Sequence, residues 1–387
     1  MIQGASLLPL ISQDSPCDGC GRTTPKVSTG LTSSYPNPSG DHLDHVRDRV
    51  AAGAEIYVGL SGGKDSVSVC LLLQRLGIPF RAIFADTGWE AELTYNYVRW
   101  FCTEREIDLI VVRGDGTEDG LLSVILRKGC FPKKQRRFCT ELLKEHPIRA
   151  YLQTRVADGA DVISVAGIRA EESAQRATMS TWAPADKRFG GVDCWHPVFD
   201  WTYEDTIQAH HDNHCKPNPL YLLGAERVGC FPCVFEKKAG LRIVSMLQPE
   251  RLAKIRDMEE AVDQQVRRAK GDAYEERNYP TSTMFWLSIN GQNRPALIDD
   301  VVERAWTPSN RKEAALLEDN LASQAAAAQE RWGFTMEIDG LGADYTPDDG
   351  AKFANYADRY LTTKDLAARA AREAQTAPAT QQLALFA

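Results

Sequence analysis

The sequence has no stretch of about 18 apolar residues, which is the length that a membrane-spanning helix needs. Its first residues also lack the basic segment and the long apolar segment of a secretory signal peptide. We therefore expect a cytoplasmic protein with no membrane partner. Positive charge is not in excess either, because the formal net charge is −8. This balance excludes a bulk electrostatic attraction to nucleic acid, although it is compatible with a local basic patch.

Cysteine is absent after Cys233, although ten cysteines occur up to that residue. In a reducing compartment, clustered cysteines indicate metal or redox chemistry more often than disulfides. The pair Cys17 and Cys20 lies in a segment rich in Ser, Pro, Gly and Thr, and residues 1–40 are therefore expected to form a flexible arm. Cys70 and Cys102 lie in apolar helical patterns and are expected in the core.

Strand and helix patterns alternate from residue 41 to about residue 235. Buried strands are predicted over 55–60, 80–86, 107–114 and 161–168, and helices over 42–54, 65–77, 90–106 and 139–156. Strands separated by helices of this length form βαβ units. The fold class is therefore α/β, with a Rossmann-like parallel sheet covered by helices on both faces.

The strand patterns fade after Gly240. The segments 241–271 and 311–333 read as helices, and the Ala-rich end of the chain reads as partly disordered. We expect a nucleotide-binding domain over 41–238, a mainly helical region over 239–360 and a tail over 361–387. The sequence HHDNH, from His210 to His214, is expected to be a solvated helix end.

The segment Ser61-Gly62-Gly63-Lys64-Asp65-Ser66 lies between a predicted strand and a predicted helix. Glycines allow the backbone to approach a ligand closely, and the free amides at a helix start favour an anion. Two serine hydroxyls and the Lys64 ammonium add donors. A plain strand-to-helix turn would need only one glycine, so this segment predicts a phosphate-binding loop.

This loop resembles the PP-loop of the adenine nucleotide α-hydrolase superfamily, whose members act at the α-phosphate of ATP or of an adenylyl compound. Further segments resemble blocks of the phosphoadenylylsulfate reductase family, namely FADTGWE at 84–90, RRFCTELLKEHP at 136–147, VAGIRAEESAQR at 165–176 and the block that ends in CFPC at 230–233. The resemblance covers about residues 55–235 and implies a sheet of the HUP type.

The resemblance implies an adenine nucleotide as ligand. Lys64, Asp65 and Arg169 are the implied catalytic residues. The implied nucleotide-binding and phosphate-binding residues are Ser61, Gly62, Gly63, Lys64, Asp65, Ser66, Asp86, Thr87, Gly88, Arg137, Lys144, Gly167, Arg169, Glu171 and Arg176. The side-chain chemistry agrees, because guanidinium groups bind phosphate in a bidentate manner and carboxylates such as Asp86 and Glu171 suit Mg²⁺. A surface ion pair is the alternative for Arg169 and Glu171.

Four cysteines, Cys130, Cys139, Cys230 and Cys233, lie in regions where some branches of the resembled family bind a [4Fe–4S] cluster. A cluster and a tetrahedral zinc ion both require four converging ligands, so spacing does not separate them. This chain lacks the tandem Cys-Cys of the cluster-bearing reductases. The cluster is favoured, with zinc and unligated cysteines as alternatives. The basic run between Arg127 and Cys139 reads as an anion-binding wall or as a contact for a nucleic-acid backbone.

Two chemistries occur in the resembled family. The sulfonucleotide reductases use a thiol near their C-terminus as nucleophile, and no cysteine follows Cys233 here. The favoured function is therefore an ATP pyrophosphatase coupled to sulfur transfer, similar to the proteins of DNA phosphorothioation and tRNA thiolation. Its partners would be a DNA or tRNA acceptor and a sulfur donor such as a cysteine desulfurase. The alternatives are a phosphoadenylylsulfate or adenylylsulfate reductase and a non-catalytic nucleotide-binding subunit of a DNA-modification or defence complex.

Overall fold

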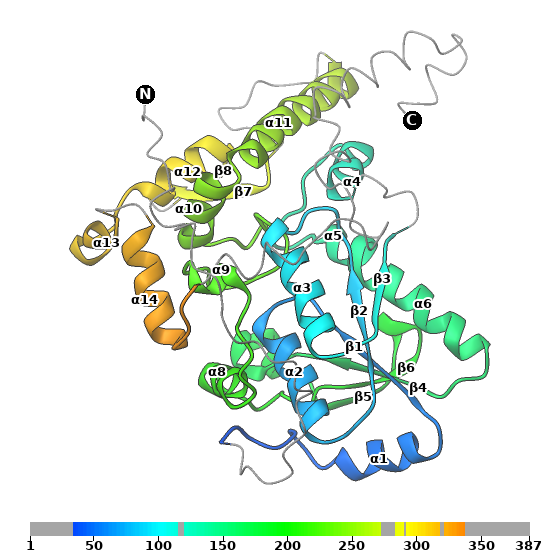
Figure 1. The fold of residues 1–387 in the computed structure, drawn as a ribbon. Coiled ribbons are helices and arrows are strands. Elements are labelled where there is room, and N and C mark those ends of the chain that lie inside the picture. The colour runs from blue at the N-terminus through cyan, green and yellow to red at the C-terminus, as the bar shows by residue number, and fades with distance from the viewer. Residues whose placement is uncertain (1–33, 115–119, 272–282, 290–291, 318–320, 337–387) are drawn as a thin grey trace.

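The computed structural model describes residues 34–114, 120–271, 283–289, 292–317 and 321–336 (Figure 1). The predicted Cys17–Cys20 arm and the tail from residue 361 lie outside these ranges. No helix within the described ranges is both long enough and apolar enough to cross a membrane.

A six-stranded sheet forms the centre of the fold, in the order β3-β2-β1-β4-β6-β5. Its strands are β1 (Glu55–Gly59), β2 (Arg81–Ala85), β3 (Leu109–Val112), β4 (Val162–Ala166), β5 (Trp182–Asp186) and β6 (Val192–Trp195). All neighbouring pairs are parallel except β5 and β6. The predicted α/β class and the four predicted strands are confirmed. The strands β5 and β6 were not predicted, because each is short and β5 contains Pro184, a residue that weakens a strand pattern.

Helices cover both faces of this sheet, as predicted (Figure 1). Alternate residues of β1 show the division, because Ile56 and Val58 lie in one apolar cluster and Tyr57 lies in another. The first cluster also contains buried residues of α1 (Leu43–Ala51), α2 (Lys64–Arg75), α3 (Glu92–Glu104) and α8 (Tyr203–Asp212). The second contains Leu152 of α6 (His146–Ala157).

The helix predicted over 139–156 consists of three parts, α5 (Phe138–Thr140), a π-helical turn (Glu141–Glu145) and α6. Pro147 lies in the first turn of α6. Because proline has no amide hydrogen, it cannot continue the regular hydrogen-bond ladder at this point. Short helices complete this part of the described chain. They are α4 (Leu121–Lys128), α7 (Ala174–Ala177) and α9 (Pro219–Leu222), with two 3₁₀ turns at Ala170–Glu172 and Lys187–Phe189.

After residue 237 the described chain is mainly helical, with α10 (Lys238–Leu247), α11 (Pro249–Lys270), α12 (Ile298–Trp306), α13 (Arg311–Leu316) and α14 (Ala322–Trp332). The helix predicted over 311–333 therefore consists of two helices. An antiparallel hairpin of β7 (Phe285–Ile289) and β8 (Gln292–Ala296) was not predicted. Buried residues of this region, such as Met258 and Val301, share one apolar cluster with Trp89 and Leu121.

Cys70 and Cys102 are buried in the core, as predicted, and so are Cys194 and Cys215. The prediction for HHDNH is wrong at its first residue. His210 is buried, and one ring nitrogen, Nδ1, lies 2.9 Å from the Cys215 carbonyl oxygen. Burial lowers its pKa to about 4, so this imidazole is neutral at neutral pH.

Candidate active site

The loop from Ser61 to Ser66 joins β1 to α2 and is closed by its own hydroxyl groups. Ser66 Oγ accepts a hydrogen bond from the Ser61 amide at 3.1 Å and donates one to the Gly63 carbonyl oxygen at 2.9 Å. Gly62 has a φ of +72°, and a Cβ there would lie 2.9 Å from a methyl group of Val98. The loop is thus held at the amino end of α2, where backbone amides favour an anion.

The end of β4 packs directly on this loop. A Cβ at Gly167 would lie 2.7 Å from the Asp65 carbonyl oxygen and 2.8 Å from the Ser66 amide nitrogen. Both atoms belong to the backbone and cannot move aside as a flexible side chain could. Gly167 is therefore required by the approach of two chain segments, whatever its part in ligand binding.

We expect Gly167→Ala to lower the free energy of unfolding by about 1–3 kcal/mol, because overpacking forces the backbone to shift. Urea unfolding measures this change. Gly229→Ala is the matched control, since nothing lies within 4 Å of a Cβ at that position. Equal losses in the two variants would contradict the close packing of β4 on the loop.

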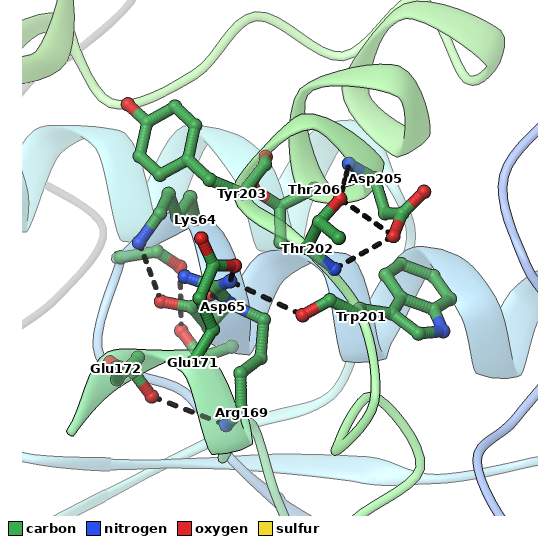
Figure 2. Close-up of polar contacts among 12 residues, drawn as sticks. Lys64, Asp65, Arg169, Glu171, Glu172, Trp201, Thr202, Tyr203, Asp205 and Thr206 are labelled. Atoms are coloured by element: carbon green, nitrogen blue, oxygen red, sulfur yellow. Dashed lines mark hydrogen bonds and ion pairs between the residues drawn. The ribbon is translucent and has the colours of Figure 1, made fainter. Parts of the chain in front are cut away.

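Lys64, Asp65 and Arg169 form a buried charge network at the loop (Figure 2). Lys64 Nζ lies 2.9 Å from one carboxylate oxygen of Asp65, and Arg169 Nε donates to the other. The Arg169 side chain is 3% exposed, and its NH1 group also contacts Glu171 at 2.7 Å and the Trp201 carbonyl oxygen at 3.3 Å. The alternative of a surface ion pair therefore does not describe Arg169.

Burial determines how these charges titrate. It lowers the pKa of Lys64, and the Asp65 carboxylate only partly opposes this effect. Burial by itself would raise the pKa of Asp65, but the charges of Lys64 and Arg169 outweigh it and the pKa is lowered. Asp65 is therefore ionised at neutral pH and holds two cations beside the loop.

Two aromatic rings lie close to the Lys64 ammonium group. Its Nζ lies 5.0 Å from the ring centre of Tyr203 and 5.9 Å from that of Tyr221, and its amide donates to the Tyr221 hydroxyl at 3.1 Å. Trp332 of α14 packs against both rings, at 6.1 and 5.2 Å. Sequence reasoning missed this wall, because its members lie far apart in the chain and have no common motif.

The segment after β2 holds two buried carboxylates. Asp86 accepts from the Tyr95 hydroxyl at 2.9 Å and from Arg113 Nε at 2.6 Å. Glu90, which sequence reasoning also missed, accepts from the Thr87 hydroxyl at 2.8 Å. The structure shows Asp86 and Glu171 each paired with a different arginine. Their joint role as Mg²⁺ ligands stays a prediction.

Residues 55–235 match the family model of the phosphoadenosine phosphosulfate reductase domain. The match covers just under half of the chain. The matched range is the one over which the sequence motifs resemble that family. In the matched domain, the PP-loop follows β1, and the DTG segment and Gly167 follow β2 and β4, at the carboxyl ends of neighbouring parallel strands. Ligands of open α/β sheets bind at that edge.

Similar proteins include an uncharacterised 37.8 kDa protein of Escherichia phage 186, which is 29% identical and matches 53% of this chain and 74% of its own length. An uncharacterised protein of Methanocaldococcus jannaschii is 30% identical over 54% of this chain and 42% of its own length. An adenosine 5′-phosphosulfate reductase of Neisseria meningitidis serogroup A is 35% identical, over 27% of this chain and 40% of its own length. The chain thus spans less than half of the latter two relatives.

Two solved structures show a distant likeness. The phosphoadenylyl-sulfate reductase of Candida auris is 17% identical to this chain and has a TM-score of 0.39. The superposition covers 50% of this chain and 90% of the Candida chain. The U34-tRNA thiolase of Methanococcus maripaludis, solved with its [4Fe-4S] cluster, is 15% identical, covers 72% of this chain and 81% of its own, and has a TM-score of 0.34.

Basic residues of the matched domain converge near the loop. Burial lowers the pKa of Arg176, and the Asp65 carboxylate raises it in part. The positive charges of Arg227, Arg137 and Arg169 lower it further. Arg176 itself contacts Glu172. The structure therefore brings the predicted Arg137, Arg169 and Arg176 toward one region, and it adds Arg227, which no motif had indicated.

Three of the four predicted cysteine ligands lie around Lys144. Burial lowers the Lys144 pKa, but Cys230, Glu90, Cys233 and Cys139 raise it by more. Lys144 Nζ lies 3.7 Å from a carboxylate oxygen of Glu90. Cys230 pairs with Glu90 through a backbone bridge, and its Sγ lies 3.8 Å from the Thr87 hydroxyl. These thiols are therefore joined to the segment that follows β2.

The cysteines are close without forming a complete ligand set. Burial raises the pKa of Cys230 to about 12, with Cys233 and Cys139 adding to the shift, and burial also raises that of Cys139. Cys130 packs against the apolar cluster that contains Trp89 and Leu121, and Cys139, Cys230 and Cys233 pack against it too. Among the described residues, no group of three or more His, Cys, Asp or Glu side chains is arranged to hold a metal ion. The donor types fit a thiolate-bound cluster or zinc, and binding of either would require deprotonation of the thiols.

Proposed function

We propose that this domain binds ATP or an adenylyl nucleotide, acts at the α-phosphate and couples that reaction to sulfur transfer. The observation that carries the proposal is the buried network of Lys64, Asp65 and Arg169 beside the PP-loop. The network holds two cationic side chains, one of them also in contact with Glu171, where the amides of the loop already favour an anion. Cationic side chains and free amides around one loop are suited to polyphosphate.

The reaction would proceed by displacement at the α-phosphorus. An acceptor oxygen forms a bond to that phosphorus, the bond to the bridging oxygen breaks, and pyrophosphate leaves with its electron pair. A sulfur nucleophile then displaces AMP from the adenylated acceptor. Lys64 and Arg169 would stabilise the charge that develops on the phosphoryl oxygens, and Asp65 would keep both side chains in position.

Mg²⁺ would accompany the nucleotide and neutralise part of its phosphate charge. It usually binds through one or two protein carboxylates together with substrate phosphates. Glu171 suits this role because its side chain is 52% exposed, whereas the Asp86 side chain is buried beside Arg113. We propose Glu171 as the first carboxylate to test, with Asp86 positioning the DTG segment through Tyr95 and Gly88.

Pyrophosphate release from ATP tests this function, with single-stranded oligonucleotides, tRNA and small oxygen-bearing acceptors offered in separate reactions. Release that depends on Mg²⁺ and on an acceptor supports it. A protein that binds ATP but releases no pyrophosphate with any of these acceptors would instead support the non-catalytic nucleotide-binding subunit.

A reductase is the second candidate, and the observation that favours it is the match of residues 55–235 to the reductase domain family. Reduction would require a thiolate to attack the sulfonate sulfur of the substrate. The 154 residues after Cys233 contain no cysteine, by the count 387 − 233. Incubation with adenylyl sulfate and a thiol donor decides the matter, since sulfite formation would favour the reductase over the pyrophosphatase.

We propose that Cys130, Cys139, Cys230 and Cys233 hold a [4Fe–4S] cluster, with zinc as the alternative. Four thiolates are the ligand set of such a cluster, which would supply sulfur or electron chemistry when bound. Lys144 would balance the negative charge of the thiolates from its place between Cys230 and Glu90.

We expect protein purified without oxygen to contain iron and to show the broad visible absorbance of a cluster, and Cys230→Ser to lose both. Metal analysis and the visible spectrum measure these. Cys102→Ser is the control, because Cys102 is a buried thiol of the apolar cluster that contains Ile56 and Val58. Stoichiometric zinc without iron in the wild type would replace the cluster with a zinc site.

A further inference from the structure

The basic run that follows α4 forms a tight hairpin turn on the surface. Lys133 and Arg136 exchange backbone hydrogen bonds, from the Lys133 amide to the Arg136 carbonyl oxygen at 3.1 Å and back at 3.0 Å. The side chains of Lys134, Arg136 and Arg137 are exposed. Because the backbone of the turn satisfies itself, these cations project from a defined support and not from an irregular loop.

Two aromatic rings lie among these cations. The Phe235 ring has three of them around it, with Lys134 Nζ at 5.9 Å, Arg137 Cζ at 5.4 Å and Arg227 Cζ at 5.5 Å from the ring centre. Trp286 of β7 is 46% exposed, an unusual fraction for tryptophan, and Lys133 Nζ lies 5.5 Å from its ring centre. We call this set of side chains the basic–aromatic patch, and it consists of Lys133, Lys134, Arg136, Arg137, Arg227, Phe235 and Trp286.

The cations of the basic–aromatic patch have no close acidic partner in the part of the protein that the structure describes. None of its five Lys and Arg side chains forms an ion pair with a described carboxylate, although the charge of Arg227 acts on the buried Glu236. This contrasts with the rest of a chain whose formal net charge is −8, and in which Arg49, Arg155 and Arg242 all pair with acids. A concentration of unpaired cations marks a surface for a polyanion.

The patch is also continuous with the candidate active site. The charges of Arg137 and Arg227 act on Arg176, and that of Arg176 acts on Lys64. Cys130 and Cys139 lie at the two ends of the segment that carries the hairpin turn. A polyanion bound to the patch would therefore pass close to both the PP-loop and the cysteines.

We propose that the basic–aromatic patch binds single-stranded nucleic acid and thereby presents the acceptor to the PP-loop; this inference rests on the proposed function. The cations would contact the phosphate backbone, and the exposed face of Trp286 would stack on a base. Stacking requires an unpaired base, which favours a single strand over a duplex. An acidic protein partner would use the same charges and the same indole ring, and the binding of poly-glutamate tests for it.

Binding is measured by fluorescence anisotropy with a labelled 20-nucleotide single-stranded DNA, an RNA of the same sequence and the corresponding DNA duplex, all without ATP. We expect both single strands to bind more tightly than the duplex. Lys134→Glu with Arg136→Glu should weaken binding at least about 10-fold and reduce the slope of log affinity against log salt by about 1–2. Trp286→Ala should weaken it by about 5–100-fold, and Trp286→Phe should restore most of the loss.

The matched control reverses two charges elsewhere, with Arg47→Glu and Lys187→Glu. Both residues are exposed, and Arg47 lies on α1, which is at the bottom of the view in Figure 1, well below α4. This variant should bind like the wild type at moderate salt. Neither set of substitutions touches Lys64, Asp65 or Arg169.

Several outcomes would overturn the proposal. The first is that the control variant weakens binding of the single strands as much as the patch variant does. The second is that the duplex binds more tightly than the single strands and Trp286→Ala has no effect on binding. The third is that poly-glutamate binds as tightly as the single strands. The last result would indicate an acidic protein partner.

The two proposals fail separately, because oligonucleotide binding without ATP does not require pyrophosphate chemistry. A protein that binds the single strands but releases no pyrophosphate would keep the patch and lose the proposed reaction. A difference between the DNA and RNA arms identifies which of the two is bound.

Discussion

Lys64→Ala should reduce acceptor-dependent pyrophosphate release about 10²–10³-fold. Loss of one preorganised charge or donor at a developing negative charge typically has this effect on a rate. The Lys64 side chain is only 7% exposed, so water does not screen its charge as it would at a surface. Because its partner Asp65 remains paired with Arg169, the variant should still fold, and a thermal unfolding curve checks this.

Two further variants make the Lys64 result specific. Lys64→Met keeps much of the length of the side chain and removes its charge, so it should be as inactive as the alanine variant. Lys238→Ala removes a lysine whose Nζ contacts Glu313 at 3.3 Å, in the C-terminal region, and its release should match that of the wild type. Equal release by wild type and Lys64→Ala would show that the PP-loop does not perform the reaction.

Arg169→Ala should lower the free energy of unfolding by about 3–5 kcal/mol, as expected when one partner of a buried ion pair is removed. The reason is that Arg169 is 3% exposed and holds Asp65, whose side chain is 14% exposed. The Trp201 carbonyl oxygen would also lose a donor. Urea unfolding gives the change, and pyrophosphate release should fall with it.

The control for this prediction is Arg331→Ala. Its guanidinium contacts Glu204 at 3.0 Å, but both side chains are more than half exposed, so its loss should cost less than about 1 kcal/mol. If Arg169 and Arg331 proved equally costly to remove, the buried network would have no special energetic role.

The strands β1 to β4 could be predicted because their sequences are nearly continuous apolar runs. Parallel strands covered on both faces need such runs, and Ile56, Val58 and Phe84 are all buried in the core. The strand β8 could not be predicted in this way, because its sequence QNRPA is polar and contains proline. Its pairing with β7 is what makes it a strand.

The site shows the same division between local and distant contacts. Residues of the PP-loop are adjacent in sequence, so glycines, serines and a lysine in that order already predict a phosphate site. Arg169 was indicated by a motif, but its burial and its contact with Asp65, 104 residues earlier, were not. Trp332 had no motif at all, and only the packing of α14 on α9 brings it to Tyr221.

By itself, the sequence determined the α/β alternation, the phosphate-binding loop and the resemblance of residues 55–235 to a known domain family, because each of these depends on neighbours along the chain. Only the tertiary structure decided which charges meet. It paired Asp65 with Arg169, gathered Cys139, Cys230 and Cys233 around Lys144, and brought Lys133 to Trp286. The physical reason is that Coulomb and packing energies depend on distance in space, and the positions of these side chains are set by a core whose members come from the whole described chain.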